Sequence, residues 1–230
     1  MKRLSALLIL ALTAASARAG DTVSIDFDVT AEAAACTPVL SNNGKVDFGS
    51  RSVGSLSAHA FTQLGTREVT LTITCESSTA VAITSRDTRS SSVRVGEDDK
   101  GGVGPLFTDH YVGYAARLFG LGFTAENKPI GSYAIQINAA GVTVSEGNQT
   151  VSVDIAGSER KNGPWDTLDY PVLPTTQDYF YTFVKKGTAA PQPVSSASVP
   201  LQISASVANN LGSSQKIALD GEAVISLVYL

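Results

Sequence analysis

The chain has 230 residues, of which 17 are basic, 21 are acidic and 43% are hydrophobic, and its formal net charge is −4 at pH 7. An acidic chain without basic clusters is a poor ligand for the phosphate backbone of nucleic acid or for anionic lipid, so we expect no nucleic-acid partner. This length suffices for one well-buried core, and a single β domain can use all of it.

Residues 1–19 are typical of a cleavable export signal. Lys2 and Arg3 give a positive start, an apolar run follows at 4–12, and Ala17-Arg-Ala19 is a small-x-small cleavage site. The competing interpretation is a membrane anchor, but the run falls far short of the roughly 20 residues that span a bilayer. We therefore expect an exported protein with no membrane insertion, and export removes only basic charge.

An N-terminal extension, residues 20–35, follows the signal and alternates between apolar and polar residues. Its apolar side consists of Val23, Ile25, Phe27 and Val29. A strand needs a partner, because its unpaired N–H and C=O groups otherwise remain exposed. The pattern suits a strand that is lent to another polypeptide. Two alternatives stay open: an ordinary first strand of its own domain, and an extension that folds back into its own domain.

Cys36 and Cys75 are the two cysteines of the chain. In an exported protein an even pair favours a disulfide. A metal-binding or catalytic thiol is the alternative, although no histidine clusters with either cysteine in the sequence.

The rest of the chain is rich in short segments with period two, which are typical of strands. Polar stretches at 87–104, 158–167 and 187–198 are expected to be loops. No amphipathic helix of useful length is evident, so we predict an all-β protein with an antiparallel β-sandwich. The expected strands are 45–48, 69–75, 80–85, 117–124, 133–138, 150–155, 179–184 and 201–207.

A β-hairpin is predicted at the C-terminus, with strands 215–219 and 222–230 joined by Asp220-Gly221 in a type I′ turn. Both faces of the last strand are largely apolar, so we expect this strand to lie centrally in the core. Its two faces are Ala223, Ile225, Leu227 and Tyr229, and Val224, Ser226, Val228 and Leu230.

These features together resemble the chaperone–usher fimbrial subunits of Gram-negative bacteria, and among them the fimbrial-like, β-fimbrial-type branch. The resemblance rests on the export signal, the alternating extension, Cys36 at a first strand, Cys75 at the end of an early strand, and the penultimate Tyr229. The chain departs from many pilins in having Ile217 where they have a glycine, fourteen residues from the end, and in its greater length.

The resemblance implies an incomplete, immunoglobulin-like sandwich of the pilin type over residues 36–230, which lacks its final strand. The extension 20–35 would then be a donor strand for a neighbouring fimbrial subunit. A periplasmic chaperone would fill the groove first, and an outer-membrane usher would secrete the subunit to a cell-surface fimbria that serves adhesion. Tyr229 and Leu230 would belong to the terminus that the chaperone recognises, or Tyr229 would simply be a core aromatic residue.

Enzymatic function finds no support in the sequence, and we expect neither a cofactor nor a metal. His59 and His110 are the only histidines, no nucleophile-elbow, phosphate-loop or zinc-protease motif occurs, and the acidic run 97–99 lacks EF-hand spacing. The alternative to a fimbrial subunit is a secreted, self-contained β-sandwich that binds a ligand such as a glycan. The aromatic residues available for a sugar site are Tyr111, Tyr114, Trp165, Tyr179 and Tyr181.

Overall fold

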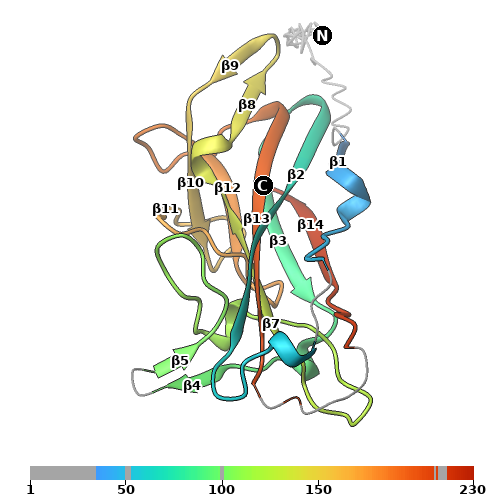
Figure 1. Ribbon diagram of the computed structural model, residues 1–230. Helices are drawn as coiled ribbons and strands as arrows, with labels where there is room; N and C mark the ends of the chain where they lie inside the picture. The colour runs from blue at the N-terminus through green and yellow to red at the C-terminus, as the bar shows by residue number, and fades with distance from the viewer. Residues whose placement is uncertain (1–34, 50–52, 99–100, 210, 212–216) are drawn as a thin grey trace, which may run out of the picture. The chain divides into compact units, whose positions relative to one another are not determined.

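Two antiparallel β-sheets make up most of the computed structural model, which describes residues 35–49, 53–98, 101–209, 211 and 217–230 (Figure 1). The predicted signal, 1–19, and nearly all of the extension 20–35 lie outside the described residues. The boundary that we predict at residue 36 stays a prediction. The strands are β1 (Cys36–Leu40), β2 (Thr62–Thr79), β3 (Val81–Asp87), β4 (Gly96–Asp98), β5 (Gly101–Val103), β6 (Phe119–Gly120), β7 (Gly131–Ile137), β8 (Thr143–Glu146), β9 (Gln149–Val151), β10 (Val153–Ser158), β11 (Asp166–Thr167), β12 (Phe180–Lys185), β13 (Val194–Val207) and β14 (Ala223–Tyr229).

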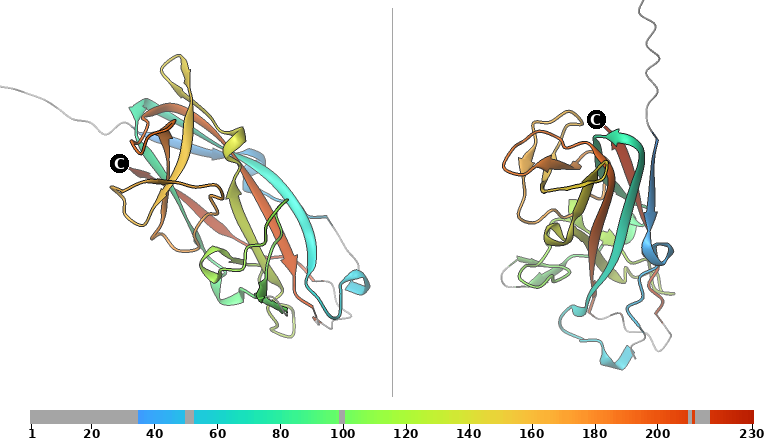
Figure 2. Two further views of the ribbon diagram at one scale, coloured as in Figure 1. Left: turned by 90° about the vertical axis from the view of Figure 1, so that its left-hand side faces the viewer. Right: turned by 90° about the horizontal axis from the view of Figure 1, so that it is seen from above.

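The strands form a large and a small sheet. The large sheet has the order β1-β2-β13-β7-β6, with β8 and β9 attached beside β13, and the small sheet has the order β11-β10-β12-β3-β14. A separate hairpin of β4 and β5 lies within 87–104. Figure 2 shows the layers from two further sides, and the predicted all-β antiparallel sandwich is confirmed. Short 3₁₀ turns are the helical elements of the described chain: Ser41–Gly44, Val53–Ser55, Ser90–Ser92, Ala115–Arg117 and Ala139–Gly141.

The core lies between the two sheets and follows the period-two pattern of the strands. In β2, alternate side chains are buried and the threonines between them face the other way, as the sequence predicts. The small sheet contributes Tyr181 and Phe183 from β12 and Ile83 from β3, all within 2% of full burial. The same cluster includes Val69, Leu71, Ile73 and Cys75 from β2 and Leu201 and Ile203 from β13.

Several expected strands are corrected by the structure. Residues 45–48 form no strand, although Val46 and Phe48 still pack against the core. The segment 117–124 contains only the two-residue strand β6. The residues on either side of β6 form turn and loop hydrogen bonds instead, such as Leu118 N–H to Ala115 O and Ile130 N–H to Gly122 O. The predicted loop 187–198 is wrong in its second half, since β13 already begins at Val194 and pairs with the end of β2.

The predicted C-terminal hairpin is also wrong. Residues 217–222 form no strand, and Gly221 does not have the positive φ that a type I′ turn requires. Instead, Asp220 donates its N–H to Leu121 O at 3.0 Å, and Glu222 O accepts the N–H of Thr88 at 3.2 Å. Long-range bonds to two loops therefore replace the local turn.

The last strand, β14, lies at an edge and not in the centre of its sheet. Within the described residues it pairs with β3 alone, in the register Ala223↔Asp87 to Tyr229↔Val81. Its two faces are as predicted: Ala223, Ile225 and Leu227 pack on the main core, while Val228 packs on a small cluster around Trp165. Each face is therefore partly covered by other side chains, while Val224 on one face and Tyr229 on the other remain exposed.

Candidate functional site

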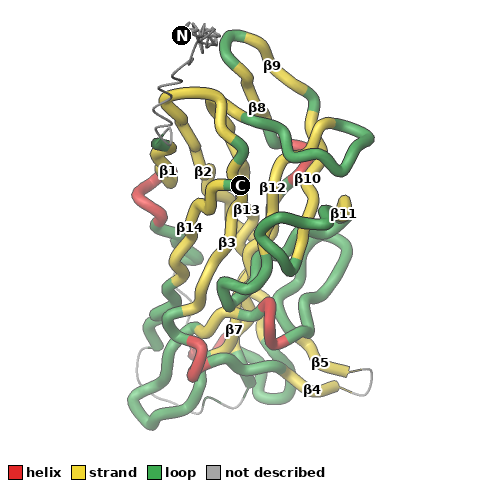
Figure 3. The backbone as a smooth tube through the Cα atoms, turned by 180° about the vertical axis from the view of Figure 1, so that it is seen from behind, coloured by secondary structure: helices red, strands yellow, loops and turns green. Residues whose placement is uncertain are grey.

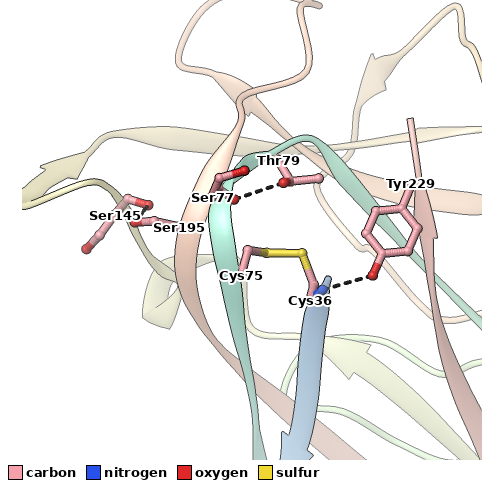
Figure 4. The surroundings of a disulfide bond; sticks show 7 residues. All are labelled: Cys36, Cys75, Ser77, Thr79, Ser145, Ser195 and Tyr229. Atoms are coloured by element: carbon pink, nitrogen blue, oxygen red, sulfur yellow. Dashed lines mark hydrogen bonds between the residues drawn. A yellow bond between two sulfur atoms is a disulfide. The ribbon is translucent and has the colours of Figure 1, made fainter. Parts of the chain in front are cut away.

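A disulfide fastens the first described strand to the large sheet. Cys36 of β1 lies directly opposite Cys75 of β2, and the two sulfur atoms are 2.06 Å apart (Figure 4). The predicted disulfide is confirmed, and the alternative of a metal-binding or catalytic thiol is ruled out for these residues.

Among the described residues, β14 has a strand partner on only one of its two edges. In an antiparallel ladder, alternate residues bond to the neighbouring strand and the residues between them point away from it. The bonds from Leu230 N–H to Ala80 O and from Thr88 N–H to Glu222 O place the even-numbered residues of β14 in the bonded positions. The N–H and C=O groups of Ala223, Ile225, Leu227 and Tyr229 therefore point to the open edge.

β1 forms the edge of the large sheet on the same side of the sandwich, as Figures 1 and 3 show. The bond from Glu76 N–H to Ala35 O places Cys36, Pro38 and Leu40 in the outward positions of β1 by the same rule. Pro38 has no N–H to offer, which is typical of an edge strand. The outer edge of β1 is thus a much poorer pairing surface than that of β14.

A groove of about 1200 Å³ lies next to the core, at the ends of these two edges that are remote from the disulfide. Its walls come from Leu40 of β1, from the segment 45–49 and from residues 217–223 with Ile225 of β14. Its floor is the inner face of the large sheet: Leu64 and Val69 of β2, Tyr133 and Ile135 of β7, and Leu201, Ile203 and Val207 of β13. An apolar floor beside a strand with a free edge is suited to an extended apolar segment.

Tyr229 links the two edges at the end of the strands that carries the disulfide. Its hydroxyl oxygen accepts a hydrogen bond from the backbone N–H of Cys36 at 2.9 Å, across the gap between β14 and β1 (Figure 4). The groove itself is bordered by Leu40 and by Ala223 and Ile225, at the ends of the two strands that lie away from the disulfide.

Close packing shapes the open end of the groove. A Cβ on Gly221 would come within 2.7 Å of Tyr133 Cε1, so this position has no room for a side chain in the present arrangement. Burial raises the pKa of Tyr133, so its hydroxyl stays neutral. Asp87, opposite Ala223, accepts N–H bonds from Gly120 at 2.9 Å and from Arg89 at 2.7 Å, and its burial raises its pKa.

The predicted site residues fall into two groups. Ala223 and Ile225 line the groove, and Leu227 packs on the core. Tyr229 lies beside Cys36, outside the groove lining, and Leu230 follows it. The predicted donor residues Val23, Ile25, Phe27 and Val29 lie outside the described residues. The sequence patterns did not indicate the floor, since it comes from three strands far apart in the chain, whereas Pro38 within a strand was a usable sign of an edge.

The aromatic residues considered for a sugar site do not form one. Trp165 and Tyr181 are buried in two different clusters, while Tyr111 and Tyr114 are exposed. Tyr179 is half-buried, with the Arg117 guanidinium 4.5 Å from its ring centre, and its ring lies tilted against that of Tyr181 at a centroid distance of 5.2 Å.

The two histidines lie outside the groove. His59 is exposed, and His110 is packed between the rings of Phe107 and Tyr170, with centroid distances of 5.4 and 4.2 Å. Asp109 Oδ1 lies 2.8 Å from His110 Nδ1, and Tyr170 donates its hydroxyl to the other carboxylate oxygen of Asp109 at 3.1 Å. The bond to His110, followed by that to Tyr170, holds the pKa of Asp109 below its ordinary value. The three side chains therefore link the loop around residue 110 to the loop around residue 170.

The described part of the chain has neither a metal-binding cluster nor a membrane-spanning helix. No group of three or more His, Cys, Asp or Glu side chains there is placed to hold a metal ion. None of the helical turns among those residues has the length and apolar character needed to cross a membrane.

Comparisons with known proteins place the chain among relatives that extend over nearly its whole length. The family model described as "Protein of unknown function (DUF1120)" matches residues 27–134. The "Uncharacterized protein YhcF" of Escherichia coli K12 is 52% identical over 227 residues, which cover 96% of this chain and 95% of that protein. "Protein GltF" of the same organism is 29% identical over 244 residues, covering 96% and 94%. No solved structure matches the chain.

Proposed function

We propose that this chain, which belongs to the DUF1120 family of proteins of unknown function, is a structural subunit of a chaperone–usher fimbria that accepts a β-strand from another polypeptide. The observation that carries the proposal is the edge of β14 that no described strand pairs with, beside a groove with an apolar floor. The function requires no catalytic residue, cofactor or metal.

The edge of β14 supports this proposal in two ways. The outward N–H and C=O groups of Ile225 and Leu227 offer main-chain hydrogen bonds to an added strand, which fix its direction and register. The groove beside Ile225 offers an apolar floor to side chains on the inward face of that strand. Strand addition uses both features at once, whereas a small ligand would leave the row of backbone groups unused.

The N-terminal extension of another subunit has the pattern that this groove requires. Its apolar side, the four residues Val23, Ile25, Phe27 and Val29, alternates with polar residues. Burial of such side chains stabilises by roughly 1.5–3 kcal/mol each, so four contribute on the order of 6–12 kcal/mol before ordering costs. Asp26 and Asp28 lie on the opposite side of the extension and favour its solubility before it is bound.

Export and assembly then follow in order. The signal 1–19 directs the chain to the periplasm, and a periplasmic chaperone covers the groove and the edge of β14, including the terminus at Tyr229 and Leu230. At the outer-membrane usher the extension of the next subunit replaces the chaperone. The result is a cell-surface fibre that contributes to adhesion.

Deletion of residues 21–30, in cells that also produce the cognate chaperone and usher, tests this function. The deleted subunit should stay soluble with its chaperone and should be absent from surface fibres. A length-matched variant, in which the four residues of the apolar side are all replaced by Asn, should behave the same. The matched control replaces Ser24, Asp26 and Asp28 by Asn and should still assemble.

Normal assembly of the deleted subunit would reject strand donation through this segment. A stable monomer that neither binds a chaperone nor forms heat-resistant oligomers would instead favour the alternative function, a self-contained binding module.

A further inference from the structure

Arg86 is an exposed cation one strand away from the edge of β14 that has no strand partner among the described residues. It lies in β3 directly opposite Val224 of β14, so both side chains point to the outer face of the small sheet. Within the described part of the chain, the Arg86 side chain forms no ion pair, whereas nearby Arg89 is paired with Asp220. Arg86 is therefore available to a carboxylate of another polypeptide.

A strand added to this edge would place every second side chain on the same face as Arg86. Adjacent strands lie about 4.8 Å apart, so the residue opposite Val224 in the added strand would be about 10 Å from Arg86 along the row. Val224 is small and 38% exposed, and the stem of an arginine can lie along such an apolar side chain while its guanidinium stays in water. The Arg86 guanidinium can therefore reach an acidic side chain at that position of the added strand.

The rows on either side of Val224 differ in how they receive a second acidic residue. On one side lies Ser226, whose Oγ accepts a hydrogen bond from Gln177 at 3.2 Å and whose own O–H can donate to a carboxylate. On the other side lies Glu222, whose carboxylate accepts the Thr88 hydroxyl at 2.6 Å. A carboxylate opposite Glu222 would be repelled, because like charges directly opposite each other are destabilising. The outer face therefore suits two acidic residues, two positions apart, opposite Val224 and Ser226.

We infer that the outer face of β14, with Arg86 as its positive group, selects an added strand that carries two acidic residues on its polar side. This inference rests on the proposed function and deepens it, because it names what the edge recognises besides apolar side chains. The sequence of residues 21–30 has this property in Asp26 and Asp28, which are two positions apart.

The same charges fix the register of the added strand. With the two carboxylates opposite Val224 and Ser226, the residue between them, Phe27, lies opposite Ile225 whether the strand runs parallel or antiparallel to β14. Ile225 lines the groove, so the aromatic side chain enters it beside the apolar floor. A shift by two residues would bring one carboxylate opposite Glu222 or would take both away from the row of Arg86.

An exchange of charge between protein and peptide tests this inference. The protein comprises residues 20–230, with the four apolar residues of its own extension replaced by Asn so that the extension does not compete, at a concentration at which the protein is monomeric. Two fluorescent peptides of residues 21–30 are compared by anisotropy. One has the native sequence, and the exchanged peptide carries Asp26→Lys, Asp28→Lys.

The variant Arg86→Glu should weaken binding of the native peptide and strengthen binding of the exchanged peptide. An exposed ion pair changes an equilibrium by about two- to fivefold, and charge reversal adds a repulsion of similar size. We therefore expect a loss of about four- to twentyfold for the native peptide at low salt, and about two- to fivefold for Arg86→Gln, which only removes the attraction. Both losses should shrink in about 1 M salt, where the screening length is about 3 Å.

The matched control is Arg160→Glu, which makes the same change in net charge away from the edge. Arg160 is an exposed residue in the loop after β10, and β12 and β3 separate β10 from β14 in the small sheet. This control should leave both affinities within about twofold of those of the parent.

Two results would overturn the inference while the proposed function stands. One is equal affinity of the parent and Arg86→Glu for the native peptide, and the other is an equal loss for Arg86→Glu and Arg160→Glu. Should Arg86→Glu not fold, as judged by circular dichroism, equal affinity of the parent and Arg86→Gln for the native peptide would overturn it. If the parent binds neither peptide, the proposed function itself fails, and the inference falls with it.

Discussion

Removal of the disulfide should lower the free energy of unfolding by an amount that depends on the length of the loop closed by the disulfide. Cys36 and Cys75 are 39 residues apart in sequence, and the chain-entropy relation gives about 4 kcal/mol for a closed loop of this size. The variant Cys36→Ala, Cys75→Ala should therefore unfold at a urea concentration about 2 M below that of the parent, for a slope of about 2 kcal/mol per molar urea. Fluorescence of the buried Trp165 follows the transition.

The control for this experiment is the parent protein in the presence of a reductant. It keeps both sulfur atoms and their packing and lacks only the covalent bond, so its midpoint should lie close to that of the double variant. Equal midpoints for the oxidised parent and the double variant would refute the reasoning. A midpoint of the reduced parent close to that of the oxidised parent would show that lost packing, and not chain entropy, causes the change.

Three further changes test the site and its surroundings. Ile225→Asp places a carboxylate in the wall of the groove and should abolish binding of a peptide of residues 21–30. The control Val224→Asn changes a residue that is 38% exposed on the opposite face of β14 and should leave peptide binding intact. Because burial raises the pKa of Asp87 above 3.8, the folded state holds the proton more tightly and the free energy of unfolding falls as the pH rises from 3.8 through the folded pKa. The urea midpoint of Asp87→Asn should therefore rise relative to that of the parent as the pH increases over that range. A difference between the two midpoints that does not change with pH would contradict the raised pKa of Asp87. Gly221→Ala brings a methyl group against Tyr133 and should destabilise by about 1–3 kcal/mol in urea titration, and an unchanged midpoint would show that the ring can move away.

The core of the sandwich was predictable because it depends on a local pattern. Alternation in a segment such as 69–75 determines which side chains face inward, and the structure buries those residues. The disulfide was also predictable, since the sequence pattern predicts export and two cysteines leave one intramolecular pairing. Neither prediction needed to know which strands are neighbours.

The position of β14 was not predictable in the same way. Two apolar faces indicate that both sides of a strand are covered, but the cover can come from a small cluster such as the one around Trp165 as well as from a central place in a sheet. Asp220-Gly221 is a strong local turn signal, yet bonds to Leu121 and the loop after β3 determine its conformation. Edge positions and grooves arise from contacts between distant segments, which no short window of sequence contains.

The most direct test of the account follows the backbone amides of β14 by hydrogen exchange in a protein of residues 20–230, with Val23, Ile25, Phe27 and Val29 all replaced by Asn. The N–H groups of Ile225 and Leu227 point to the open edge, while those of Val224 and Ser226 bond to β3. Addition of the 21–30 peptide should slow exchange at the first pair by about 100-fold or more and leave the second pair, already protected, nearly unchanged. Slow exchange at Ile225 and Leu227 without peptide, or exchange that the peptide does not change, would contradict the claim that this edge of β14 accepts an added strand.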